Sequence, residues 1–497
     1  MAFPNGTVTP DGSIMRGWGD RQSRARSLGI VALSIALLSA AACSSESAKS
    51  GGSSTTVAAD QPLKVTWMPG FAAPGTPDKY NQVGVIKIGP ANARNVIVLE
   101  PGTSAGAAYF VPLAQWIISK APGWQVWSVE RRGNLLEDQS ELDAFKQGTA
   151  DPQQLFDYYL GYLKNPAVKQ HFEIISPPSV AFAKQWGMNV AVQDLRVVIN
   201  AATTLGGKVV LGGHSLGGSV VTAYATWDFG GTAGAFGLAG LAYIDGSSSP
   251  TPVDAATATM ALQSLDADSA SPWLSFGGIG APYAGVFNAT GSLAALKNPD
   301  EASLGQASGL LPADLVPKVA VTNAGQYGYA LDSATSPQSL AAAQAHLGTG
   351  LATTGATRGW DGTGALTPLD RYATMFSGAG IAGADGTEWY FPQRLTNDTR
   401  VVANGNANPG QEVLGLHATM GDKLPKGLLI VAFGAQLGGS GVLDATHRLA
   451  EQSGIPAANL TLIDRHGTYA HNDPAGAFPN NEFVDSLVPM LTKLGLG

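Results

Sequence analysis

The sequence predicts an α/β fold, in which a mostly parallel β-sheet is flanked by helices and interrupted once by a large, mostly helical insertion. Short apolar runs with the length of buried strands alternate with segments of helical periodicity in both halves of the chain. Between residues 247 and 424 the strand periodicity disappears, and Ala, Gly, Ser, Thr and Pro dominate. We therefore expect a core built from residues 61–246 and 425–497, with 247–424 inserted as a cap.

The composition limits what the chain binds. Of its 497 residues, 44% are hydrophobic and 13% are charged, which is typical of a globular protein and not of a disordered one. The formal net charge is −8 and Lys and Arg together number 29, which argues against a nucleic acid as partner. No metal-ligating cluster or phosphate-binding loop is evident, so we expect neither a metal nor a cofactor.

The N-terminal residues predict export. Several arginines precede a short apolar run at 28–38, small residues follow, and the single cysteine of the chain, Cys43, comes directly after them. A charged region, an apolar region too short to span a bilayer comfortably and a small-residue site together form a secretion signal, here residues 1–43. Residues 1–14 lack these features, so Met15 is a candidate start.

The residues around the cysteine indicate how the chain is held after export. Residues 40–43 resemble a bacterial lipobox, in which the cysteine is lipidated, although Ala40 stands where Leu is usual. We expect an extracytoplasmic protein anchored to the membrane through a lipid on Cys43, with a secreted protein cut before Cys43 as the alternative. Residues 44–60 are rich in Ser and Gly and predict a flexible linker.

The first strands of the sheet follow this linker. Apolar runs at 63–67 and 83–88, separated by a turn-rich segment, predict an antiparallel lead-in. Residues 95–100 and 125–130 have the composition of buried strands, and the first of these runs directly into the turn PGTSAG. The apolar spacing from 180 to 202 then predicts a helix, with Asp194 and Arg196 on its outer side.

The centre of the pattern is the stretch 208–221, KVVLGGHSLGGSVV. It begins as a buried strand and ends as a helix of small and apolar residues, with the motif G-x-S-x-G between them. In such a turn the backbone of the central Ser is strained and its hydroxyl projects above the sheet, while Gly213 and Gly217 avoid collisions that a Cβ would cause. A Gly-rich chain matches this motif by chance more readily, but the flanking strand and helix favour Ser215 as a nucleophile.

The remaining elements lie on either side of the insertion. Residues 238–244 predict a buried strand that ends directly before Asp245. After the insertion, strands are expected at 427–433 and 460–464, and helices at 444–452 and 482–494.

The motif and the order of these parts resemble the α/β-hydrolase superfamily over residues 63–246 and 425–494. The resemblance implies a triad in the chain order Ser, acid, His. It also implies an oxyanion hole formed by two backbone N–H groups, one from Leu216 after the nucleophile and one from Thr103 in the loop PGTSAG, which resembles a lipase loop. Arg131 and Arg132 resemble the turn after the fourth strand of the superfamily, where arginines anchor the loop.

A Ser hydroxyl needs a base, and an imidazole serves because it exchanges a proton near neutral pH. The resemblance places this base after the last strand, where His466 and His471 both lie. We expect His471, because its loop is long enough to return over the sheet edge and H-x-D resembles the sequence around the base of several lipases. His466, two residues after the strand, is the alternative, and His214 is interpreted as a packing residue.

The acid is less clearly placed. Its usual position in the superfamily is the loop after the seventh strand, where this chain has Leu437. Two carboxylates are candidates: Asp245 after the sixth strand and Asp444 further along the later loop. Asp444 is also interpretable as the N-cap of its helix. We prefer Asp245, because a charge at the end of a buried apolar strand is costly unless it is paired.

These residues predict a serine hydrolase that cleaves carboxylic esters through an acyl-enzyme. The aromatic side chains of the insertion favour an apolar substrate, and export favours a lipid or cell-envelope ester. Two alternatives remain open. One is a serine peptidase or amidase with the same triad, and the other is a non-catalytic lipoprotein that binds a hydrophobic ligand or partner on this scaffold.

Overall fold

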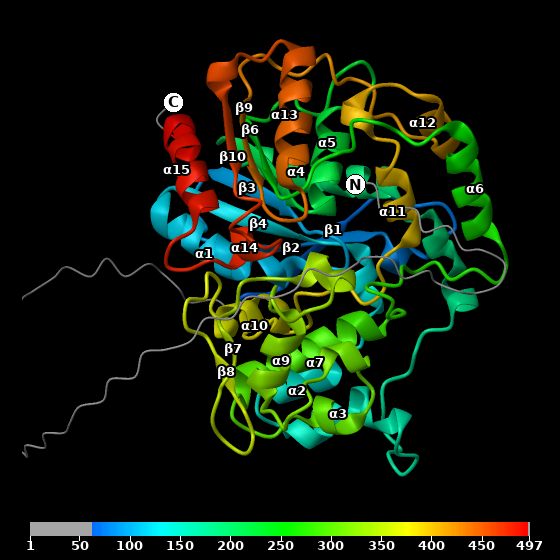
Figure 1. Cartoon of the computed structure of the whole chain (residues 1–497). Helices are drawn as coiled ribbons and strands as arrows, with labels where there is room; N and C mark the ends of the chain where they lie inside the picture. The colour runs from blue at the N-terminus through cyan, green and yellow to red at the C-terminus, as the bar shows by residue number, and fades with distance from the viewer. Residues whose placement is uncertain (1–61, 496–497) are drawn as a thin grey trace, which may run out of the picture. The chain divides into compact units, whose positions relative to one another are not determined.

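The computed structural model describes residues 62–495, whose main feature is an eight-stranded sheet with helices on both faces (Figure 1). The strands are β1 (Val65–Pro69), β2 (Gln82–Ile88), β3 (Asn95–Glu100), β4 (Trp124–Glu130), β5 (Val209–His214), β6 (Gly240–Ile244), β9 (Leu429–Gly434) and β10 (Leu460–Asp464). Their order across the sheet is β1-β2-β4-β3-β5-β6-β9-β10. Strand β2 is antiparallel to β1 and β4, and all other pairs are parallel, so the predicted fold class is confirmed.

Two hydrophobic cores cover the two faces of the sheet. Along β3, Ile97 and Leu99 pack in the core that contains α1 (Val111–Lys120) and α15 (Glu482–Gly495). Val96 and Val98 point to the other face and pack in a second core, to which three helices contribute. These are α4 (Met188–Thr203), α5 (Leu216–Ala225) and α13 (Gly439–Ser453). Continuous apolar strands are therefore explained by burial on both sides, as in parallel sheets.

Helix α4 departs from the sequence prediction in two respects. It begins at Met188, because Pro177–Gln185 forms a 3₁₀ helix with a non-helical residue inside it. Arg196 is exposed as expected, but Asp194 is buried, with 6% of its surface exposed. The prediction for Asp194 was wrong because the helix pattern contains no information on Arg132, whose guanidinium lies 2.6 Å from the carboxylate and compensates its burial.

The segment between β6 and β9 contributes helices to two parts of the structure. Helices α6 (Ala255–Asp266), α11 (Gln393–Thr399) and α12 (Pro409–Leu414) pack beside the core of the sheet, where α11 contacts α4 and α5. The other elements are α7 (Tyr283–Lys297), α8 (Leu304–Ser308), α9 (Asn323–Leu331), β7 (Gly350–Leu351), β8 (Trp360–Asp361) and α10 (Leu369–Ser377). Among these, α9 and α10 pack on α7 and form a second layer, in the lower half of Figure 1.

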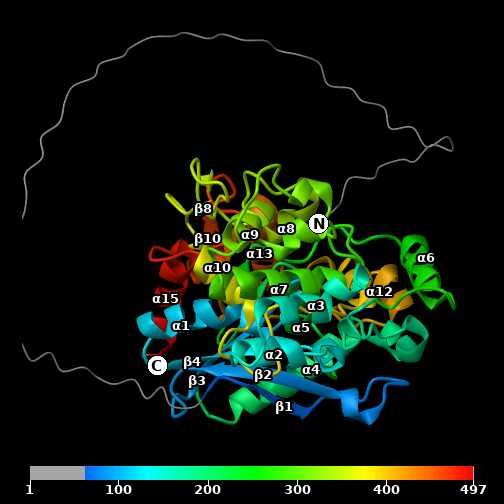
Figure 2. The ribbon, with the colours of Figure 1, turned by 90° about the horizontal axis from the view of Figure 1, so that it is seen from below.

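Two helices from the first half of the chain complete this second layer. Helices α2 (Ser140–Lys146) and α3 (Pro152–Tyr159) both contact α7, and Figure 2 shows them alongside it. The region predicted as one cap, 247–424, therefore contributes to both layers, and the second layer also includes residues that precede β5. That this layer acts as a lid stays a prediction.

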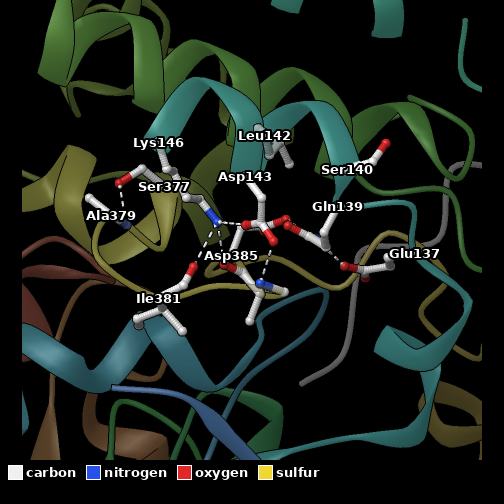
Figure 3. A network of polar contacts seen from close by, with 12 residues as sticks. Glu137, Gln139, Ser140, Leu142, Asp143, Lys146, Ser377, Ala379, Ile381 and Asp385 are labelled. Carbon is white, nitrogen blue, oxygen red and sulfur yellow. Dashed lines mark hydrogen bonds and ion pairs between the residues drawn. The ribbon is translucent and has the colours of Figure 1, made fainter. Parts of the chain in front are cut away.

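A polar network ties α2 to the segment 377–389 of the insertion (Figure 3). Lys146 donates to two backbone carbonyls of this segment, at 3.0 and 2.7 Å, and Asp143 accepts a backbone N–H from it at 2.8 Å. At the other end of the helix, the Gln139 amide donates to Asp385 at 2.7 Å. Burial lowers the pKa of Lys146 and raises that of Asp385.

The predicted secretion signal 1–43, its lipidated Cys43 and the linker 44–60 lie outside the described residues. Within residues 62–495, no helix combines the length and the hydropathy that crossing a bilayer requires.

Candidate active site

The turn between β5 and α5 has the strained geometry that the motif predicts. Ser215 has φ 55° and ψ −125°, a conformation that L-residues rarely adopt. A Cβ on Gly213 would lie 2.4 Å from the backbone of Gly217, and a Cβ on Gly217 would lie 2.2 Å from the carbonyl oxygen of Glu100. Gly213 is therefore required for the turn to close, and Gly217 for the turn to pack against β3. Ser215 is left partly exposed at the end of β5.

Asp245 and His471 form a buried pair beside this turn. The Asp245 carboxylate lies 2.6 Å from His471 Nδ1, and the two side chains are 0% and 1% exposed. Asp245 directly follows β6, in a left-handed conformation with φ 45°, and His471 lies in the loop after β10. Because the carboxylate occupies Nδ1, Nε2 is the ring nitrogen left to exchange a proton. It is buried and has no hydrogen-bond partner among residues 62–495.

The loop after β9 explains how Asp245 replaces an acid in the usual position. The carboxylate accepts three backbone N–H groups from this loop: Ala435 at 2.7 Å, Gly438 at 2.8 Å and Leu437 at 3.2 Å. Burial disfavours the charged form, but the hydrogen bond and charge of His471, with smaller effects from His214 and the Ala435 N–H, outweigh it and hold the pKa of Asp245 below its usual value. The loop that lacks a carboxylate thus binds one from the neighbouring strand.

Neither alternative residue is bonded to this pair. His466 has 63% of its side chain exposed, and its Nδ1 lies 2.6 Å from Asp464. Asp444 is exposed on α13, and its interpretation as an N-cap is wrong because the helix already begins at Gly439. The structure therefore brings together Asp245 and His471 and leaves both alternatives on the surface.

Ser215 and His471 line the same small hollow, with a volume of about 50 Å³. Thr103 also lines it, and a Cβ on the neighbouring Gly102 would lie 2.9 Å from the Ser215 Cβ, so the loop after β3 is in contact with the turn. Within the described residues, the Ser215 hydroxyl and the His471 ring are not joined by a hydrogen bond. Such contacts are often long in unliganded hydrolases.

Two backbone N–H groups beside the hollow have no protein acceptor among the residues that the structure describes. One belongs to Thr103 and the other to Leu216, the first residue of α5. The first N–H groups of a helix have no partner within the helix, and they carry its positive dipole end. Neither N–H group is therefore engaged by another group in the described part of the chain.

Arg131 fixes the loop that contains Thr103. Its guanidinium donates to the carbonyl oxygens of Pro101, Gly102 and Ala105 at 2.9, 2.6 and 3.1 Å. The prediction that Arg131 anchors a loop agrees with these contacts, but nothing in the sequence indicated which loop. The arginine therefore occupies the carbonyls of Pro101, Gly102 and Ala105 as acceptors.

Two acids hold the arginine in turn. The Arg131 guanidinium lies 2.7 Å from Glu100 at the end of β3 and 2.8 Å from Glu388 of the insertion. The backbone N–H of Glu388 also donates to the carbonyl of Ser104 at 2.9 Å. The segment of the insertion that α2 binds is therefore joined directly to the loop beside the nucleophile.

His214 contacts His471, the proposed base. The sequence did not indicate this contact. Its Nε2 lies 2.9 Å from the backbone carbonyl of His471, and the two rings are 4.4 Å apart. A carbonyl only accepts, so Nε2 carries the proton. Burial, reinforced by the neighbouring His471, lowers the pKa of His214 to about 3, so the ring stays neutral. His214 is buried as expected of a packing residue, but it also holds the His471 backbone.

The strand order, the strained turn after β5 and the chain order Ser215, Asp245, His471 are now all in place. This is an α/β-hydrolase fold. No family model matches the sequence, and no curated protein matches it either. Function therefore has to be inferred from the residues of this chain.

Solved structures with a similar chain path include three of interest. A Sulfolobus solfataricus protein with a provisional lipase assignment is 15% identical, with a TM-score of 0.43, 87% of this chain covered and 93% of that one. The thioesterase domain from the curacin biosynthetic pathway is 10% identical, with a TM-score of 0.39 and coverage of 87% and 100%. The monoacylglycerol lipase of Paleococcus ferrophilus is 13% identical, with a TM-score of 0.36 and coverage of 83% and 99%.

Proposed function

We propose that the protein is a serine hydrolase that cleaves carboxylic esters with an apolar substituent. The observation that supports this most directly is the buried pair of Asp245 and His471, whose unpaired Nε2 belongs to a residue that lines the same hollow as Ser215. A strained serine, an imidazole with a free Nε2 and a carboxylate bonded to its Nδ1, in this chain order, are the components of acyl transfer.

In the proposed reaction, the Ser215 hydroxyl attacks the ester carbonyl while His471 Nε2 takes its proton. The N–H groups of Thr103 and Leu216 stabilise the resulting oxyanion. The imidazolium then gives its proton to the leaving alcohol, and an acyl-enzyme forms. Water, deprotonated by the same nitrogen, then attacks the acyl carbon. The bond to Ser215 Oγ breaks, the imidazolium returns its proton to that oxygen, and the acid is released. Asp245 holds the ring in the required tautomer and stabilises the imidazolium.

The nucleophile is tested with p-nitrophenyl butyrate and a fluorophosphonate probe. We expect Ser215→Ala to lower kcat by at least about 10³-fold, because the oxyanion hole and binding alone retain only part of the catalysis. The probe should modify the peptide that contains Ser215. The exposed Ser179 provides a matched control, and Ser179→Ala should keep the wild-type rate. A wild type no faster than Ser215→Ala would favour the non-catalytic binder.

The other two members of the proposed triad, Asp245 and His471, are tested against the alternatives Asp444 and His466. Asp245→Asn should lower kcat by about 10⁴-fold, because the ring loses its tautomer. His471→Ala should be impaired at least as strongly. The matched variants Asp444→Asn and His466→Ala change exposed residues and should keep the wild-type kcat. Loss of activity in His466→Ala with full activity in His471→Ala would exclude the proposed base.

Ester and amide substrates share this chemistry. Comparing p-nitrophenyl butyrate with the corresponding p-nitroanilide tests the preference, and a higher kcat/KM for the anilide would favour the peptidase or amidase alternative.

A further inference from the structure

The second layer contains a cavity of about 580 Å³, within the size range of pockets that bind small molecules. It lies between α3, α7, α8 and α9, and its walls are mostly apolar. They include Leu155 on α3, Gly291 and Ala294 on α7, and Tyr327 and Leu331 on α9. A largely apolar cavity of this size is the usual form of a small-molecule site.

This cavity adjoins the hollow beside Ser215. Four residues line both spaces: Phe276, Ala284, Asn288 and Ala343. The hollow itself has a volume of only about 50 Å³, against about 580 Å³ for the cavity. It therefore holds the reacting group of an ester and little more, so the rest of a substrate needs a neighbouring space.

The boundary between the two spaces contains one polar side chain. Asn288 on α7 is partly exposed, and its Oδ1 accepts the hydroxyl of Tyr327 at 2.7 Å. Because this oxygen is already satisfied, an alkyl chain passing it leaves no additional buried acceptor unpaired. The other three boundary residues are apolar and are compatible with a hydrocarbon chain.

The outer end of the cavity has a different character. Asp151, Gln153 and Glu301 line it and are exposed to solvent. Asp151 accepts the N–H of Gln154 and Glu301 accepts the Asn298 amide, so each carboxylate keeps its remaining oxygen for a neutral or cationic group. At low ionic strength their charges repel a negatively charged one. The cavity thus has apolar walls and an acidic outer end.

We propose that this cavity binds the alkyl chain of the ester substrate, so that the enzyme selects esters with a long, neutral chain and rejects chains that end in a carboxylate. The proposal rests on the proposed function for the position of the ester group at Ser215. The chain extends from that hollow past Asn288 and lies between α7 and α9.

Chain-length dependence is the first test. Burying one further methylene is expected to raise kcat/KM by up to about fourfold, so activity should rise steeply from p-nitrophenyl acetate to the dodecanoate. The variant Gly291→Leu fills the cavity: a Cβ at this position meets only the Tyr327 ring, at 3.4 Å, and Leu is the better helix former. It should lower kcat/KM for the dodecanoate at least tenfold and leave that for the acetate unchanged.

Gly441→Leu provides the matched control. Gly441 lies on the exposed side of α13, where a Cβ meets nothing within 4 Å. This variant should behave as the wild type with both esters. Equal effects of Gly291→Leu on the acetate and the dodecanoate, or no effect on either, would overturn the proposal while the esterase activity itself stood.

Ligand binding to a protein that lacks the nucleophile separates the cavity proposal from the proposed hydrolysis. In the Ser215→Ala protein, calorimetric titration should detect 1-decanol binding. It should detect binding of 10-hydroxydecanoate at least tenfold more weakly at low salt, and neither ligand should bind when Gly291→Leu is added. If 1-decanol binds but no ester is hydrolysed, the cavity assignment stands and the proposed function fails. Equal binding of both ligands would overturn the stated selectivity, and no binding of either would overturn the cavity assignment.

Discussion

At the scale of single residues, the site depends on side chains that satisfy several groups at once. Asp245 accepts one imidazole and three backbone N–H groups, and Arg131 donates to three carbonyls and two carboxylates. Each is buried, so each would be costly without these partners. A buried charged side chain therefore indicates which neighbouring groups are held in place, as well as bearing on stability.

Arg131 is expected to position the oxyanion hole without contacting the substrate. Arg131→Lys replaces a planar guanidinium by one ammonium, which cannot hold three carbonyls and two acids together. If the loop then loses one N–H donor, kcat should fall by about 10²-fold with little change in KM. Steady-state kinetics with p-nitrophenyl butyrate measures this split.

Arg132→Lys provides the control for this prediction. Arg132 is also buried and paired, but with Asp194, and it does not contact the loop of Thr103. We expect this variant to lower the Tm without the specific loss in kcat. Equal losses of kcat in the two variants would show that Arg131 acts through stability alone.

At the scale of elements, the loop of the proposed base is held by the insertion. The Asn472 side chain donates to the carbonyls of Ala342 and Gln344, both at 3.1 Å. The next residue, Asp473, accepts His346 Nδ1 at 2.6 Å and the Thr367 hydroxyl at 2.7 Å. The H-x-D sequence that favoured His471 thus has a structural reason, because its aspartate binds the second layer.

The His346–Asp473 pair makes stability depend on pH. The hydrogen bond to Asp473, against partial burial, raises the pKa of His346, and Asp332 adds a smaller effect of the same sign. A raised pKa means that the stabilisation is complete below about pH 6.5, the ordinary His value, and is lost as pH rises through the folded-state pKa. The Tm advantage of the wild type over His346→Gln should therefore shrink from pH 5.5 to pH 8.5.

His447→Gln serves as the control for this titration. His447 is exposed on α13, with 60% of its side chain accessible, and its nearest acid is 3.9 Å away. Thermal unfolding of this variant should follow the wild type at every pH. An advantage over His346→Gln that stays constant with pH would contradict the assignment.

At the scale of the whole molecule, the described residues form a sheet and a second layer that meets the carboxyl ends of its strands. The hollow at Ser215 is lined from both layers, with Phe276, Asn288 and Ala343 from the insertion. The cavity in the second layer shares four lining residues with this hollow, which is why it bears on the proposed substrate choice.

Anchoring to the membrane stays a prediction from the N-terminal sequence. When the full chain is expressed in a bacterium, the wild type should sediment with membranes and carry a lipid on Cys43. Cys43→Ser should lack the lipid and appear in the soluble fraction, whereas Ser44→Ala should behave as the wild type. Identical fractionation of all three proteins without lipid would favour the secreted alternative.

The sequence by itself determined the features that depend on neighbouring residues. These are the strand pattern, the strained turn at Ser215, and the short sets of candidates for the base and the acid. Local sterics and hydrophobic periodicity fix such features within a few residues, so they can be predicted from one sequence. The preference for Asp245 came from the same source, because the cost of an unpaired buried charge is a local property.

Only the tertiary structure decided which distant groups meet. It paired Asp245 with His471 and placed Arg131 under the loop of Thr103, and it buried Asp194 against the outward prediction. The cavity was also beyond the sequence, because its walls come from helices far apart in the chain. The physical reason is that the energy of a charge or a cavity depends on what surrounds it in space, and periodicity along the chain does not contain that information.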